Sequence, residues 1–210
     1  MNSSPTTDTS PRGSILGNRV TRTEDPGLLT GSRRYIADLD LDEPLHAVFV
    51  RSDVAHGTIN SIEVDEARSM PGVVAVWTAT DLAVEPHHGF AVIDPAFARP
   101  PLAVDKVRFV GEAVAVVFAE SAAEGVDAAQ AVWADIDPLP TVTDPEAALA
   151  PNAPVIHDGK GNNVAVAESQ DTPLDLEECS DVLVRGRYVN QRVAVAPMEP
   201  HGVAAAPAED

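Results

Sequence analysis

The chain has 210 residues, of which 44% are hydrophobic and 4% aromatic, so it is long enough for one large domain or for a domain and part of another. Its 33 acidic and 14 basic residues give a net charge of −19. This charge excludes nucleic acid and anionic membranes as expected partners, because both require cationic patches. Cys179 is the only cysteine, which excludes an intramolecular disulfide and a cysteine-ligated iron–sulfur cluster or zinc ribbon within this chain.

The N-terminal residues 1–16 lack the apolar core of a signal peptide and are predicted to form a disordered tail. No apolar run approaches the length that spans a membrane, so we expect a cytoplasmic chain. Residues 23–31 then predict one helical turn. Asp25 is the expected N-cap, Pro26 suits the first helical position, and Gly31 suits a left-handed residue after the turn.

Strands and a short helix are predicted between residues 45 and 78. The pattern indicates a strand over 45–51 and a second over 58–64, whose apolar face changes at Ser61 and therefore suggests a bulge. A short helix over 65–70 ends at a Pro-Gly pair. A third strand over 73–78 is apolar on both faces, which is typical of a central strand.

Residues 85–101 form a long loop that contains four prolines. Loops of this length without regular structure are commonly functional. A strand over 108–119 follows, and then a helix opened by a capping box of Ser121 and Glu124. Gly125 inside this helix suggests close packing against a neighbour. The helical spacing predicts a buried stripe made of Ala122, Val126, Ala129 and Trp133.

The remaining segments are a strand over 134–137, a short capped helix over 144–149 and a polar, proline- and glycine-containing connector. Beyond the connector, residues 182–202 predict an extended strand with a bulge or a break. Such a strand needs a partner for its backbone donors and acceptors, and the sequence after Gly202 offers none. We therefore expect the front of a larger assembly.

Local motifs for catalysis or metal binding are weak in this chain. Gly159-Lys160-Gly161 is the only G-x-G and is interpreted as a turn, and the adjacent His87 and His88 do not suit a single metal ion. Glu199 is the first carboxylate to consider, although capping or a hydrogen bond is the favoured interpretation over catalysis. Cys179 lies in an acidic run that disfavours the thiolate.

A series of short segments, in the same order along the chain, resembles the start of the large subunits of the xanthine dehydrogenase/aldehyde oxidase family. They are Gly17–Val20, Arg22–Gly31, Arg34–Asp38, Leu45–Ser52, Ala55–His56, Met70–Val76, Val110–Val117, Leu139–Pro140, Asp144–Ala148, Val189–Arg192 and Pro197–Pro200. Each segment is weakly specific alone, and the collinear set from Gly17 to Gly202 is specific.

The resemblance implies an α/β (α+β) fold. After the tail, residues 17–150 would form the family's α/β hammerhead domain with a mixed sheet, 151–180 a connector, and 181–210 the first strands of an incomplete molybdopterin-binding domain. The completed enzyme would carry molybdenum–molybdopterin. It would hydroxylate an aldehyde or an N-heterocycle, or oxidise carbon monoxide, and pass electrons to [2Fe–2S] clusters and FAD on partner domains or subunits.

The resemblance transfers no catalytic, cofactor-binding or metal-binding residue to this chain. The family's Gly-Gly-Gly-Phe-Gly type loop and its late active-site glutamate have no counterpart in the sequence. Phe90, in the loop over 85–101, is the one residue expected to border a substrate funnel, with a plain surface loop as the alternative.

Two hypotheses follow. In the first, the chain is the N-terminal part, or a split subunit, of a molybdenum hydroxylase. Its partners would be the chain carrying the rest of the molybdopterin-binding domain and the iron–sulfur and FAD subunits. In the second, it is a stand-alone hammerhead domain that serves as a binding or scaffold module. That module would keep residues 182–202 protected within its own fold.

Overall fold

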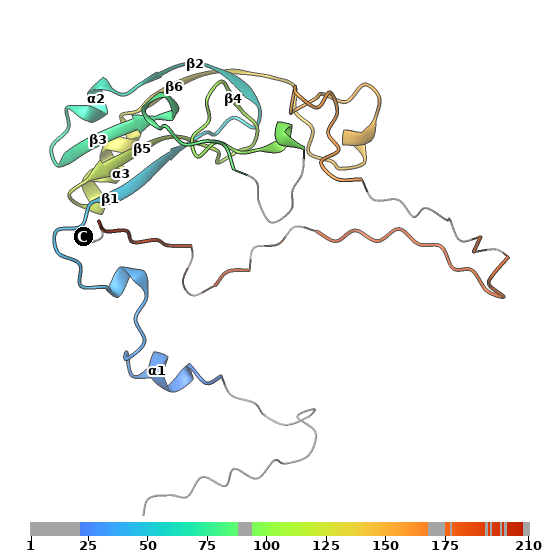
Figure 1. Ribbon diagram of the computed structural model, residues 1–210, viewed down its shortest axis with the longest axis horizontal. Helices are drawn as coiled ribbons and strands as arrows, with labels where there is room; N and C mark the ends of the chain where they lie inside the picture. Colours follow the sequence, from blue (N-terminus) through green and yellow to red (C-terminus); the bar gives the residue numbers. More distant parts are fainter. Residues whose placement is uncertain are drawn as a thin grey trace, which may run out of the picture. The chain divides into compact units, whose positions relative to one another are not determined.

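The structure of the chain is a computed structural model (Figure 1). It describes residues 22–87, 94–167, 175–176, 178–191, 193, 195–197, 199 and 201–207. They form two compact units: one comprises Asp42–Arg185, and the other combines the described residues up to Leu41 with those from Gly186 onward.

The first sheet of the larger unit has the strand order β1-β5-β3, with β1 at His46–Arg51, β5 at Ala113–Ala119 and β3 at Val73–Thr78. Strand β5 is central and mostly buried, because it pairs on both sides. The prediction that β3 is central was wrong. It is an edge strand. Its second face is apolar because it carries Trp77, a partly exposed side chain that packs edge-on against Phe118, with 4.7 Å between the ring centroids.

The second sheet has the order β4-β2-β6, with β4 at Lys106–Val107, β2 at Gly57–Glu63 and β6 at Trp133–Pro138. The predicted bulge at Ser61 is confirmed by a register shift between Ile59 and Ser61. All four strand pairings among the described residues are antiparallel. Two antiparallel sheets therefore replace the expected mixed sheet, and the α+β class is confirmed.

The described residues of this unit form the α-helices α2 at Asp65–Arg68 and α3 at Ala122–Gln130. Ser121 is the N-cap as predicted, since the Glu124 backbone N–H donates to Ser121 Oγ at 3.3 Å; the Glu124 carboxylate accepts from the Ser121 hydroxyl at 2.7 Å. The predicted buried stripe was wrong by about one residue position around the helix. Ala122, Val126 and Trp133 are exposed, whereas Gly125 and Ala128 are buried. The small residues define the buried face because α3 packs closely on β1.

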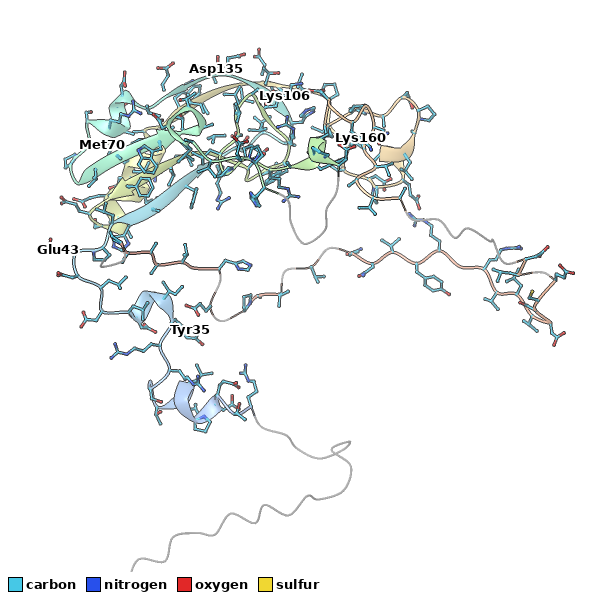
Figure 2. All side chains as sticks on the ribbon, viewed as in Figure 1. Tyr35, Glu43, Met70, Lys106, Asp135 and Lys160 are labelled. Atoms are coloured by element: carbon cyan, nitrogen blue, oxygen red, sulfur yellow. The ribbon has the colours of Figure 1, made fainter. Side chains whose placement is uncertain are left out.

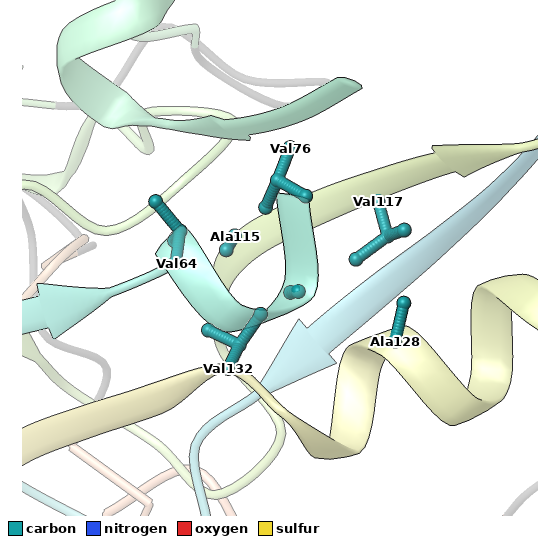
Figure 3. Packing of buried hydrophobic residues seen from close by; sticks show 7 residues of the cluster. Val64, Val76, Ala115, Val117, Ala128 and Val132 are labelled. Carbon is teal, nitrogen blue, oxygen red and sulfur yellow. The ribbon is translucent and has the colours of Figure 1, made fainter. Parts of the chain in front are cut away.

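The core lies where α2 and α3 meet the first sheet (Figure 3). A single cluster joins residues of both helices, of the connections beside them and of the two strands β3 and β5: Val64, Ala67, Val76, Ala115, Val117, Ala128 and Val132. Burying one valine side chain of this kind stabilises the fold by about 1.5 to 3 kcal/mol. A second cluster of Ala103, Val107 and Val114 packs against residues of both sheets and holds the chain after the long loop in place.

The smaller unit contains α1 at Asp25–Leu29 and a 3₁₀ turn at Ile36–Asp38. Gly31 adopts the predicted left-handed conformation, with φ of 70°. Asp25 is the first helical residue and Glu24 the N-cap, one position earlier than predicted.

The predicted strand over residues 182–202 is not formed by the described residues of this segment, which have no regular secondary structure. The side chains of Val182, Tyr188 and Val195 are between 79% and 89% exposed. An isolated extended segment is not stable without a neighbour to pair its backbone, which explains the difference from the pattern. Within the described part of the chain, no helix combines the length and apolar character needed to cross a membrane.

Candidate functional site: the long loop and the segment that holds it

The long loop over residues 85–101 is closed at its base by a short antiparallel bridge. The backbone N–H of His87 donates to the carbonyl of Arg99, and the N–H of Arg99 donates to the carbonyl of His87, each at 2.9 Å. Phe90, the predicted funnel residue, and His88 lie outside the described residues. The described part of the loop resumes at Asp94.

The second half of the loop begins with a 3₁₀ turn at Pro95–Phe97. Asp94 caps this turn, because its Oδ1 accepts a hydrogen bond from the Ala96 N–H at 3.0 Å. An Asp followed by Pro is a favourable start for such a turn, since Pro lacks the N–H that would otherwise have no partner. Local sequence therefore defines the geometry of this part of the loop.

A distant tetrapeptide, His157–Lys160, contacts the turn and the strand that follows it; we call it the clamp segment. It is itself a tight turn, in which the Lys160 N–H donates to the His157 carbonyl at 3.1 Å. Gly159 lies so close to the loop that a Cβ atom there would be 3.3 Å from Ala96 Cβ. Figure 1 shows the green turn beside the orange chain that carries the clamp segment.

Two ion pairs join the clamp segment to the loop and to β4. Lys160 Nζ lies 2.8 Å from Asp94 Oδ2, with both side chains 33% exposed. Lys106 and Asp158 form the second pair; both lysines are labelled in Figure 2. The hydrogen bond from Lys160, followed by that from the Ala96 N–H, lowers the pKa of Asp94. The hydrogen bond from Lys106 likewise lowers the pKa of Asp158.

His157 adds a hydrogen bond and a ring contact. Its Nδ1 lies 2.9 Å from the carbonyl oxygen of Ala96, and its ring centroid lies 4.6 Å from that of Phe97. Burial lowers the pKa of His157, the hydrogen bond to Ala96 opposes this shift, and the surrounding charges act in both directions. The carbonyl can only accept, so Nδ1 carries the proton in this contact.

Asn163 stabilises the chain that leads into the clamp segment. The Asn163 side-chain amide donates to the carbonyl of Pro154 at 2.8 Å and to that of Ala148 at 3.3 Å, and its Oδ1 accepts from the Ile156 N–H at 3.0 Å. One side chain thereby cross-links the turn that precedes the clamp segment. The same loop borders a hollow of about 280 Å³.

Buried polar side chains lie near the clamp segment. Glu112 is buried and accepts a hydrogen bond from the Arg108 N–H. His56 is also buried, with Nδ1 2.8 Å from the carbonyl oxygen of Pro140, as expected for a hydrogen-bonding histidine. His56 Nε2 and Arg108 Nε are buried and make no hydrogen bond within the described part of the chain.

The remaining sequence candidates are placed as follows. Glu199 Oε1 accepts a hydrogen bond from the Ile36 N–H at 2.6 Å, within the smaller unit, which is the predicted hydrogen-bonding role. Gly159-Lys160-Gly161 is a turn, as predicted, and Cys179 is exposed. Among the described residues, no group of three or more His, Cys, Asp or Glu side chains could hold a metal ion.

The arrangement is chemically a scaffold for a loop rather than a set of reacting groups. The clamp segment is not evident from the sequence pattern, because His157–Lys160 lie in a stretch that the pattern indicates to be a polar connector. The sequence signal for this segment is a histidine, an acidic residue and a basic residue clustered around a glycine, in His157-Asp158-Gly159-Lys160. The opposite charges that complete it are Asp94, within the long loop, and Lys106, just after it.

Two antiparallel three-stranded sheets with helices packed on one of them define the class of protein as an α+β hammerhead. The family model for the aldehyde oxidase and xanthine dehydrogenase a/b hammerhead domain matches residues 30–140, more than half of the chain. The chain belongs to the aldehyde oxidase and xanthine dehydrogenase family.

Relatives and solved structures agree with this assignment. The chain is 38% identical over 196 residues to the nicotine 6-hydroxylase large subunit of Paenarthrobacter nicotinovorans, covering 90% of this chain and 24% of that protein. It is 34% identical to the xanthine dehydrogenase molybdenum-binding subunit of Escherichia coli O157:H7, covering 81% and 24%. Quinoline 2-oxidoreductase from Pseudomonas putida 86 superimposes with a TM-score of 0.62 at 42% identity, covering 74% and 20%. The chain thus spans about a quarter of the length of these relatives.

Proposed function

We propose that this chain is the N-terminal portion, or a split subunit, of a molybdenum-dependent hydroxylase or dehydrogenase. The observation that carries the proposal is the similarity over 90% of the chain to the large subunit of a hydroxylase, together with similarity to a molybdenum-binding subunit. Both relatives continue well beyond the matched part. The chemistry of the complete protein would therefore depend on residues that this chain lacks.

The role we assign to this chain is structural. The larger unit presents the long loop, and Phe90 within that loop would border the substrate funnel. Molybdenum–molybdopterin would be bound by the part of the large subunit that follows, since the sequence here contains no Gly-Gly-Gly-Phe-Gly segment. The [2Fe–2S] clusters and FAD would belong to partner domains or subunits. No bond-making step is assigned to residues of this chain.

The assay that tests this role uses the chain co-expressed with its genetic neighbours. Purified complex is supplied with nicotine, quinoline, xanthine or an aldehyde and an artificial electron acceptor. Turnover of at least one substrate is expected, and Phe90→Ala should raise KM severalfold with kcat nearly unchanged, because it removes uniform binding. Phe49→Ala, at an exposed phenylalanine of β1, is the matched control. A complex that turns over none of them would count against the proposal.

The second candidate is a stand-alone hammerhead module with a binding or scaffold role. The observation in its favour is the self-contained core of the Asp42–Arg185 unit. It requires residues 182–202 to be protected by the chain itself, whereas the described side chains there are largely exposed. Hydrogen exchange on the isolated chain separates the two candidates.

A further inference from the structure

We propose that the clamp segment, His157–Lys160, is a positioning element that holds the turn at Pro95–Phe97 and thereby contributes to substrate selection; its effect on substrate rests on the function proposed above. Three residues of the segment lie against residues 94–97 of the loop, and Asp158 pairs with Lys106 of β4. His157 and Gly159 contact the turn itself, and Lys160 and Asp158 pair with the charges before and after it.

The contacts are of different kinds, and this makes the arrangement specific. Lys160 forms an ion pair with Asp94. His157 forms a directional hydrogen bond with the Ala96 carbonyl and a ring contact with Phe97. A solvated ion pair alone is worth little. A half-buried pair combined with a hydrogen bond and a ring contact can fix one backbone geometry, because all three contacts are made by the same arrangement of the turn.

Asp94 binds the turn and the clamp segment at the same time. Its Oδ1 caps the turn through the Ala96 N–H, and its Oδ2 accepts from Lys160. The charge of Lys160 therefore acts on the residue that shapes the turn. Loss of that charge should loosen the turn without touching the buried clusters, since neither Asp94 nor Lys160 belongs to them.

The position of the clamp segment in the sequence makes its contacts with the loop long-range, tertiary ones. It lies more than 50 residues after the loop it holds, so its contacts are not a by-product of local chain geometry. The base of the loop is closed independently by the bridge between His87 and Arg99. The clamp segment therefore controls the orientation of the turn rather than the existence of the loop.

The test compares Lys160→Met, which removes the charge, with Lys160→Arg, which keeps it. Hydrogen exchange is measured on the full 210-residue chain at the Ala96–Arg99 amides, and Asp65→Asn on α2 is the remote control, with an Asp65 side chain that is 97% exposed. Lys160→Met should speed exchange by about three- to tenfold, and Lys160→Arg should remain within about twofold of the parent chain. Equal exchange in all variants would overturn the proposal.

The second readout is kinetic and uses the assembled complex with whichever of the four substrates it converts. Lys160→Met should raise KM with kcat unchanged, and Lys160→Arg should restore KM. Faster exchange with an unchanged KM would also overturn the proposal, since the segment would then be merely structural. If the complex converts none of the substrates, the proposed function fails, and the exchange measurement still decides whether the segment holds the turn.

Discussion

His157 contributes two contacts to the clamp segment at once, a hydrogen bond to the Ala96 carbonyl and a ring contact with Phe97. Burial favours the neutral imidazole and lowers the pKa of His157, while the hydrogen bond to Ala96 opposes this shift. The charged groups that face it are Arg99 and Arg108, which also lower its pKa, and Glu112, which raises it. A single half-buried histidine thus makes the loop attachment sensitive to pH.

The sign of that sensitivity follows from linkage. The pKa of His157 is lower in the folded chain than in the unfolded chain, so the unfolded state binds more protons as pH falls below about 6.5. Stability contributed by neutral His157 is therefore complete above about pH 6.5 and is lost as pH falls toward the folded pKa. The parent chain should lose its stability advantage over His157→Gln as pH falls below about 6.5, as followed by urea unfolding. A pH-independent difference would contradict this.

At the scale of elements, the packing of α3 on β1 depends on the absence of a side chain. A Cβ atom at Gly125 would lie 2.7 Å from Val48 Cγ2, which is closer than atoms in contact can approach. Alanine favours a helix by about 1 kcal/mol over glycine, so helix propensity and packing predict opposite effects of adding this methyl group. The overlap is with a buried face, and we expect packing to decide.

Gly125→Ala should therefore destabilise the chain by about 1 to 3 kcal/mol in a urea unfolding experiment, because the added methyl overpacks the contact with β1. The matched control is Val126→Ala on the same helix. Val126 is 48% exposed, so its truncation should change stability by less than about 0.5 kcal/mol. A stabilised Gly125→Ala chain would show that α3 does not pack as described.

The same helix shows what could be predicted from the sequence. The start of α3 was predictable because Ser121 and Glu124 carry a local capping signal, and the Ser61 bulge because one strand changes its apolar face. The buried face of α3 was not, because Val126 is more apolar than the small residues that pack closely, and Trp133 begins β6 instead of extending the helix. Strand order and the clamp segment depend on long-range contacts, which local periodicity does not encode.

For the whole molecule, the notable surface is the C-terminal stretch of exposed apolar side chains. Val182, Val184, Tyr188, Val193 and Val195 are each at least 78% exposed, although the sequence alternates as in a strand. A chain with a net charge of −19 is not expected to bury this stretch by associating with itself, because self-repulsion opposes it. The proposed function gives the stretch a partner, the remainder of the large subunit.

In the isolated chain, amides of residues 183–191 should exchange at close to the intrinsic rate, since no strand pairing protects them. In the assembled complex, the same amides should be protected by about a hundredfold or more, as for strand pairing in a folded domain. Mass spectrometry of peptic peptides gives both values. Protection already present in the isolated chain would favour the stand-alone module.

If this chain is part of a molybdenum-dependent enzyme, as proposed, the metal must accompany it through purification. Molybdenum content is measured by inductively coupled plasma mass spectrometry on the complex that copurifies with the tagged chain. We expect close to one molybdenum atom for each copy of this chain. A homogeneous preparation in which the chain purifies with its genetic neighbours and carries no molybdenum would contradict it.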